Sequence, residues 1–434
     1  MNVNVLSFQR AIIYLTIISA FTGSLWLFEV GPIHIFPFRI FLILMFLLFI
    51  WFVYIIKHGR LNLSHIKVKL YMKFLAIWLV YAFLSIMWAA DQIAALKNII
   101  FLFTGISIIF FLVYYMRDIN HLNYLYWIWL SIFIALIPIG FWEITTGNHL
   151  AVSTLREEDR SWVMFAPTTV FHNQNDYAAF IVLAIPMIIT AIRYCSKLYI
   201  RVLGVLVLLC GLFLLIMTTS RSCYLALFTG LAFWLLFFMR GKTKLKVISV
   251  VAAISIFLIL FIPSTIYDSF TLIGEEMSSL SRVYNDEDAP DVRKNLIKNG
   301  LYFTAQSAGF GVGAGNAEYY MEHYKVYPTG HITNVHNWWA EILTNYGIFI
   351  FAGYIIFYGS LLLNLWQVYK KTHVLQEKMI CEALLIGLVS FFMASISSSS
   401  IIAFPPQWIF FGFALAFLNY TRIKALERSN PCAL

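Results

Sequence analysis

The chain has 434 residues, of which 61% are hydrophobic and only 12% are charged, and its mean hydropathy is +0.81. A water-soluble core of this length does not need so much apolar surface, so a soluble globular protein is excluded and repeated membrane spans are expected. The net charge of +9 comes from Lys and Arg at the ends of these spans, which argues against nucleic acid as a partner.

Hydrophobic runs of spanning length recur along the chain and predict an all-α integral membrane protein with about twelve transmembrane helices. The first run has no small-residue cleavage site after it, so we interpret it as a retained span and not as a signal peptide. The expected spans are roughly 11–30, 39–56, 70–89, 98–115, 123–142, 174–192, 202–219, 222–239, 247–263, 347–366, 379–395 and 404–420.

The charges between the spans predict the orientation. Lys and Arg concentrate in alternate segments, such as "KHGRLNLSHIKVK", "RGKTKLK" and the C-terminal tail, so both termini are expected in the cytoplasm. Spans one to nine then fill 1–263, with an outer loop at 143–173. A large extracytoplasmic loop with short amphipathic helices follows at 264–346, and three spans with a cytoplasmic tail occupy 347–434.

Polar residues mark the outer mouth of the sixth expected span. The stretch "FHNQNDY" places His172, Asn173 and Asp176 there, a mixture of imidazole, amide and carboxylate that suits hydroxyl-rich ligands such as sugars. Arg160, just upstream in "REEDR", is a further candidate for substrate binding. Ion pairing with its acidic neighbours is a sufficient alternative explanation for Arg160.

Two outer arginines break the expected distribution of positive charge. Arg221 lies in the tight turn "TTSRSCYLAL", and Arg293 lies on an expected helix, "DVRKNLIKNG". Leu296 and Gly300 share the face of Arg293, so this face can rest on the membrane. A guanidinium binds phosphate oxygens through two parallel hydrogen bonds. The alternatives are a contact with lipid headgroups for Arg221 and a solvated charge for Arg293.

The stretch "HITNVHNWWAEILTNYG" crowds polar groups at the start of the tenth expected span. His336, near a helix start and on the face of Ala340, resists protonation there and suits a general base. His331, Asn337 and Glu341 are candidate substrate contacts, and the last two share a helix face. No third ligand has diagnostic spacing, so no metal site is expected. The alternative is a histidine that merely lies at the membrane interface.

The glycine-rich stretch "GFGVGAGN" has no surrounding strand–turn–helix unit and lies in the outer loop, so it does not predict a nucleotide site. Glycines of this kind let the backbone approach a ligand or another segment.

Together, the twelve-span layout, "TTSRSCYLAL", "GFGVGAGN" and "HNWWAEILTNYG" resemble the bacterial O-antigen ligase and polymerase superfamily. The resemblance implies a GT-C-like, metal-independent, inverting glycosyltransferase without a cofactor. It acts on the outer face of the bacterial inner membrane in O-antigen, capsule or exopolysaccharide synthesis. The implied partners are an undecaprenyl-pyrophosphate-linked glycan donor, a glycan or lipid-linked acceptor, membrane lipids, a flippase and a chain-length regulator. By the same resemblance, Arg221 and Arg293 hold the pyrophosphate and His336 takes the proton of the acceptor hydroxyl.

The sequence leaves polymerase and ligase open, and the acceptor can be a lipid-A core, a repeat unit or a protein. A polymerase is slightly favoured because ligation to lipid A is restricted to organisms with an outer membrane. The alternative from another class is a twelve-span transporter or flippase of lipid-linked glycans. Transporters usually have two related halves and ionisable residues at the bilayer midplane, and neither pattern is seen in this sequence.

Overall fold

The computed structural model describes residues 2–22, 28–30, 33–56, 61–157, 163–239, 241, 289–396 and 401–429. The ninth expected span, 247–263, lies outside these residues, as does part of the large loop. The helices of the described part are α1 (Asn2–Phe21), α2 (Pro37–Trp51), α3 (Lys69–Leu84), α4 (Gln92–Tyr115), α5 (Ile119–Thr146), α6 (Gln174–Tyr194), α7 (Leu198–Met217), α8 (Arg221–Phe237), α11 (Ala289–Gln306), α12 (Ala317–His323), α13 (Trp338–Lys371), α14 (Leu375–Ala394) and α15 (Pro405–Ser429).

These helices form a multi-pass, α-helical membrane protein. Within the described residues, 8 helices are long and apolar enough to cross a bilayer, namely α2 to α7, α13 and α15, and α8 is a shorter apolar helix. Large apolar side chains such as Leu70, Phe228 and Ile356 are exposed on the outside of the bundle. Their exposure to water would be unfavourable, whereas a surrounding bilayer accommodates them. The helical membrane class is therefore confirmed, while the total of twelve spans stays a prediction.

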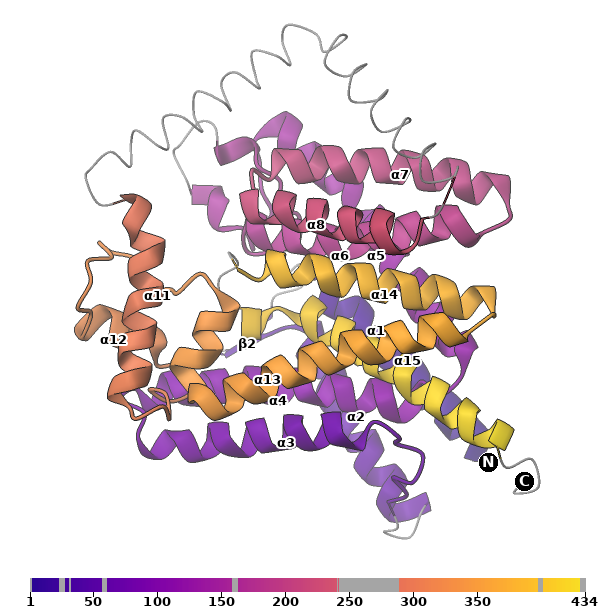
Figure 1. Cartoon of the computed structure of the whole chain (residues 1–434), viewed down its shortest axis with the longest axis horizontal. Coiled ribbons are helices and arrows are strands. Elements are labelled where there is room, and N and C mark those ends of the chain that lie inside the picture. Colours follow the sequence, from indigo (N-terminus) through magenta and orange to yellow (C-terminus); the bar gives the residue numbers. More distant parts are fainter. Residues whose placement is uncertain are drawn as a thin grey trace, which may run out of the picture.

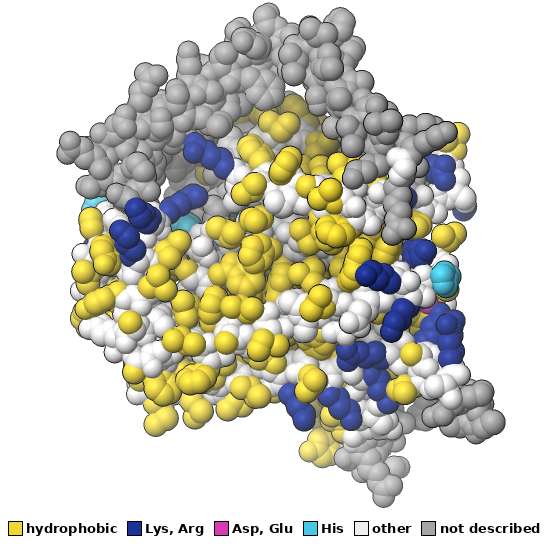
Figure 2. All heavy atoms as spheres, in the orientation of Figure 1, with side chains coloured by type: hydrophobic (Ala, Val, Ile, Leu, Met, Phe, Trp, Pro, Cys, Tyr) yellow, Lys and Arg dark blue, Asp and Glu magenta, His cyan; other side chains and the backbone are white. Residues whose placement is uncertain are grey.

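The spanning helices run side by side, and one helix lies across their ends (Figure 1). The helix α14 packs against both α6 and α8, and α15 packs against α4. At one end of this bundle α11 runs crosswise, next to α12 and the start of α13. We call this the α11 end. Hydrophobic side chains cover the middle of the visible face, and Lys and Arg side chains lie towards its two ends (Figure 2).

Hydrogen bonds define which helix ends meet at the opposite end of the bundle. Gln9, near the start of α1, donates to the carbonyl of Leu48, near the end of α2, at 3.0 Å. The backbone N–H of Lys67, before α3, donates to Asn419 of α15 at 2.6 Å. The start of α1 and the end of α15 therefore share one end of the bundle, as expected for two termini on one side of a membrane.

A buried carboxylate ties three helices together near that end. Glu382 of α14 is fully buried and accepts hydrogen bonds from Arg193 Nη1 at 2.6 Å, Trp234 Nε1 at 2.7 Å and Tyr194 OH at 2.6 Å. A carboxylate inside a membrane protein is costly unless it is paired and hydrogen-bonded. This network therefore holds α6, α8 and α14 in register.

The extent predicted for the first span is wrong. The sequence predicted a helix over 11–30, but α1 spans Asn2–Phe21, and β1 (Phe28–Val30) pairs antiparallel with β2 (Ile33–Ile35). Phe28 lies opposite Ile35 in this short hairpin. Over so few residues an apolar run does not distinguish strand from helix, which is why the pattern failed there.

Candidate functional site

His336 lies in a turn at the α11 end, immediately before α13. Its backbone has a φ of 49°, a left-handed conformation that is uncommon for a residue with a side chain, and its N–H donates to Asn334 Oδ1 at 2.9 Å. The helix begins only at Trp338, where Asn337 Oδ1 caps the N–H of Ala340 at 3.1 Å. The expectation that His336 shares a helix face with Ala340 is therefore wrong. The left-handed backbone of this turn, and not a helix, sets the direction of the His336 side chain.

Burial and the nearby guanidinium of Arg293 both lower the pKa of His336. The imidazole is half-buried, whereas Arg293 is exposed on α11. Both effects disfavour the charged imidazolium, so the ring is neutral at neutral pH. A neutral imidazole can accept a proton, and the charge of Arg293 would attract an anionic ligand to the same region.

The segment that carries His336 is fastened to α11 by two buried asparagines. Asn295 donates to the carbonyl of Pro328 at 2.9 Å, and Asn299 donates to the carbonyl of Tyr327 at 2.9 Å. Asn299 also accepts the N–H groups of Val326 and Tyr327. Because α11 holds the segment by backbone contacts, Arg293 and His336 belong to one packed unit.

The helix α11 packs on protein along the face that carries Leu296 and Gly300. Leu296 is fully buried in a small core with Phe303 and Met321, and at Gly300 a Cβ would lie 2.5 Å from the hydroxyl of Thr344. The face that includes Leu296 and Gly300 was expected to rest on the bilayer. That expectation is wrong, because α13 and α12 supply the apolar surface instead.

The glycine-rich stretch approaches another segment of the chain. The helix α13 has a kink at Gly347, with φ 75° and ψ −175°, a conformation open to glycine alone. At Gly347 a Cβ would lie 2.1 Å from the carbonyl oxygen of Gly309, and the N–H of Ile348 donates to that oxygen at 2.9 Å. Gly313 N–H donates to the carbonyl of Asn345 at 3.0 Å. The glycines thus fix the first turns of α13 beneath His336.

Arg221 begins α8 at the same end of the bundle. The tight turn before it is held by Tyr224, whose hydroxyl donates to the carbonyl of Ile216 at 2.5 Å. The side chain of Arg221 is exposed, and the free N–H groups of a helix start add positive potential beside it. The helix α8 packs on α14, and Ser395 after α14 accepts the N–H of Trp338 at 3.0 Å. The helix α14 and the residue after it therefore contact both α8 and the start of α13.

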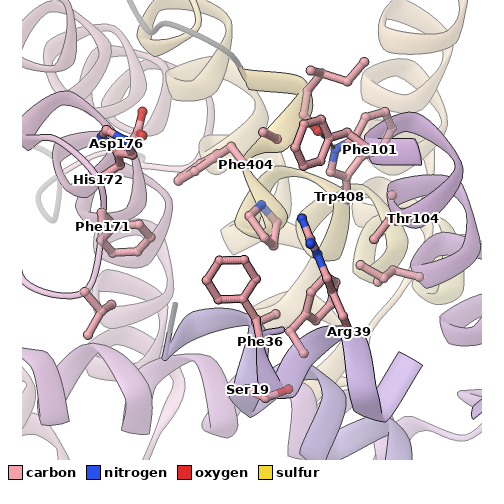
Figure 3. Close-up of a pocket in the computed structure, with 18 of the residues that line it drawn as sticks. Ser19, Phe36, Arg39, Phe101, Thr104, Phe171, His172, Asp176, Phe404 and Trp408 are labelled. Carbon is pink, nitrogen blue, oxygen red and sulfur yellow. Dashed lines mark hydrogen bonds between the residues drawn. The ribbon is translucent and has the colours of Figure 1, made fainter. Parts of the chain in front are cut away.

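His172, Asn173 and Asp176 lie elsewhere at this end, at the start of α6. Asn173 caps the helix, accepting from the N–H of Asp176 at 2.9 Å and donating to its carboxylate at 3.0 Å. All three line a cavity of about 380 Å³ that they share with Arg39 (Figure 3). Sequence reasoning missed Arg39. Arg39 begins the second span on the side that the sequence predicts to be outside, against the positive-inside pattern, and this is the signal that could have found it.

Of the remaining candidates, Glu341 lines a second cavity of about 300 Å³ together with Asn334 and Lys97. Asn337 acts as the helix cap described above, and His331 is exposed in the turn before His336. Arg160 lies outside the described residues. The structure thus brings His336, Arg293, Asn337 and Glu341 to one region and the His172 group to a neighbouring cavity.

The loop that carries His172 is anchored by a buried pair, Glu143 and His149. Glu143 accepts the N–H groups of Thr168 at 2.8 Å and Thr169 at 2.7 Å, and His149 Nδ1 lies 3.2 Å from Glu143 Oε1. Burial opposes protonation of His149, but the hydrogen bond and charge of Glu143 outweigh it and raise the pKa of His149. The pair fixes both ends of the loop.

Replacing Glu143 with glutamine is expected to destabilise the protein by about 3 kcal/mol, because it breaks a buried charged pair. The pKa of His149 is raised on folding, so the protonated imidazole stabilises the folded state through its pairing with Glu143. This stabilisation is fully present below a pH of about 6.5 and is lost as pH rises through the raised pKa. The difference in the thermal unfolding temperature Tm between wild type and Glu143→Gln should therefore become smaller as the pH is raised from 6 to 9. Glu322→Gln, at an exposed position on α12, is the matched control.

Comparisons with known proteins bear on the same region. Residues 205–357 match a protein-family model described as O-Antigen ligase, and this range includes Arg221, Arg293 and His336. The chain is also similar to the teichuronic acid biosynthesis protein TuaE of Bacillus subtilis (strain 168), with 35% identity over 417 residues. That alignment covers 95% of this chain and 84% of the relative.

Proposed function

Because this chain belongs to the O-antigen ligase and polymerase family, we propose that it transfers a glycan from an undecaprenyl-pyrophosphate-linked donor to a sugar hydroxyl. Family membership makes it a ligase or polymerase of polysaccharide biosynthesis, and it does not favour the transporter alternative. The observation that carries the proposed chemistry is the half-buried imidazole of His336, in a turn whose preceding segment is fastened to α11, the helix that carries Arg293.

The reaction is a displacement at the anomeric carbon of the donor sugar. A ring nitrogen of His336 accepts the proton of the acceptor hydroxyl, whose oxygen forms the new bond to that carbon with inversion. The bond from the carbon to the pyrophosphate oxygen breaks, and the leaving pyrophosphate keeps its electron pair. Arg293 and Arg221 stabilise this developing charge through hydrogen bonds that strengthen as it builds.

The location of the chemistry follows from the substrate. A polyprenyl tail stays in the bilayer and presents its pyrophosphate at the membrane surface, which is where a loop meets the start of a spanning helix. The α11 end fits such a place, since α11 lies across the ends of the spanning helices there (Figure 1). In the proposal this end faces outwards, both termini are cytoplasmic, and a flippase delivers the donor while a chain-length regulator assists. Asn337 and Glu341, with His331 near by, would contact sugar hydroxyls.

Transfer is expected to proceed in EDTA and without ATP, because two guanidinium groups supply the charge that a divalent cation would otherwise provide and the donor is already activated. The assay uses the purified chain in detergent with an undecaprenyl-pyrophosphate-linked glycan, and it measures product by gel or mass spectrometry. A rate that collapses in EDTA and recovers with added Mg²⁺ would contradict the proposed mechanism.

The relative's name places TuaE in teichuronic acid biosynthesis. We carry over from it that the product of this chain is a cell-envelope polysaccharide. In the proposal, the sugars and their linkage are selected by the cavities at the α11 end.

A further inference from the structure

The cavity around Arg39 is lined by helices distant in sequence. It lies among the end of α1, the starts of α2, α6 and α15, and the middle of α4, with a volume of about 380 Å³. Most of its wall is aromatic or aliphatic, including Phe36, Ile100, Phe101, Phe404 and Trp408. A wall of this kind among membrane-spanning helices matches a hydrocarbon chain.

Charged and polar groups lie on opposite sides of this cavity. The guanidinium of Arg39 lies 5.0 Å from the ring centroid of Phe36 and points into the space (Figure 3). His172 and Asp176 occupy the wall across from it. A guanidinium suits phosphate oxygens, and a carboxylate with a neighbouring imidazole suits sugar hydroxyls. The cavity thus combines the three chemistries that a sugar linked by pyrophosphate to a lipid would need, namely an apolar wall, a guanidinium and polar groups.

The cavity adjoins the region of His336. Phe101, Ile402 and Ala403 line both this cavity and the second one of about 300 Å³. The second cavity is also lined by Asn334, which accepts the N–H of His336 at 2.9 Å. The two cavities therefore share a wall, and the second one borders the turn that carries the proposed base.

Neither Arg221 nor Arg293 is among the described residues that line the Arg39 cavity. We propose that this cavity is a second polyprenyl-pyrophosphate site, which seats the acceptor while Arg221 and Arg293 hold the donor. The inference rests on the proposed function and deepens it. An acceptor that is itself linked to a carrier lipid makes the enzyme a polymerase that joins lipid-linked glycans.

Binding stoichiometry tests the proposal, with undecaprenyl pyrophosphate as the probe and native mass spectrometry of the purified full chain in detergent. Wild type is expected to bind two molecules. Arg39→Gln should keep one, the double variant Arg221→Gln/Arg293→Gln should keep the other, and the triple variant should keep none. Arg156→Gln, at an exposed arginine of the outer loop, should still bind two. Uncharged undecaprenol should not reproduce this pattern, because it lacks the pyrophosphate.

A second variant guards against misfolding of Arg39→Gln. Thr104 of α4 lines the cavity, and Thr104→Trp fills it without removing a charge, so one bound molecule is again expected. Two bound molecules in both variants would overturn the second site. The second site would also be overturned if wild type binds only one molecule and Arg221→Gln/Arg293→Gln binds none. That result would leave the proposed function intact. Wild type that binds none would contradict both.

Discussion

Replacing His336 with alanine is expected to lower the transfer rate by about 10²–10⁴-fold, the range that general-base catalysis contributes. Donor binding should stay close to wild type, since Arg221 and Arg293 remain. The measurements are kcat with an undecaprenyl-pyrophosphate-linked glycan and the Kd of undecaprenyl pyrophosphate. His323→Ala is the matched control, because His323 is exposed on neighbouring α12, where its ring stacks on Tyr319 and its Nδ1 lies 2.9 Å from the carbonyl oxygen of that residue.

The pH profile separates a base from a structural residue. Because burial and Arg293 lower the pKa of His336, wild-type transfer should fall only when pH drops below about 6.5, through that lowered pKa. Arg293→Gln removes one of the two causes, so its acidic limb should move to higher pH. If the acidic limb of the pH profile persists unchanged in His336→Ala, the limb belongs to another titrating group and His336 is not the base.

The helical class follows from the hydropathy pattern, because a bilayer forces the backbone to satisfy its hydrogen bonds within each span. The same pattern failed at Phe28–Val30, where a short apolar run forms a strand. It also began the tenth span at 347, whereas α13 begins at Trp338, next to the polar stretch that predicted a helix start there. The kink at Gly347 was not predicted, since it depends on the carbonyl of Gly309 packing against it. Such boundaries are set by tertiary contacts.

Motifs identified candidate residues one at a time, but their grouping depends on packing. The sequence could place Arg293 and His336 in one loop, whereas their electrostatic contact requires α11 to dock through Asn295 and Asn299. The Arg39 cavity could not be inferred, since helices hundreds of residues apart form its walls. Local patterns carry no information about such neighbours.

Replacing Arg293 with lysine is expected to lower kcat by about 10²-fold, although the charge is retained. A guanidinium forms two parallel hydrogen bonds to phosphate oxygens, whereas an ammonium is a point charge that cannot reproduce this geometry on a leaving pyrophosphate. The cation near His336 remains in this variant, so the acidic limb of the pH profile should stay at its wild-type position. The steady-state rate and the pH profile are measured on the same preparation.

Arg293→Lys and Arg293→Gln together separate two roles of one side chain. If Arg293 clamps the pyrophosphate, both variants lose rate; if its charge also tunes His336, only the glutamine variant shifts the acidic limb. Arg156→Lys, at an exposed arginine of the outer loop, controls for the loss of a guanidinium as such and should retain wild-type turnover. Wild-type turnover in Arg293→Lys would instead reduce Arg293 to a surface charge and leave the pyrophosphate to Arg221 and the helix start behind it.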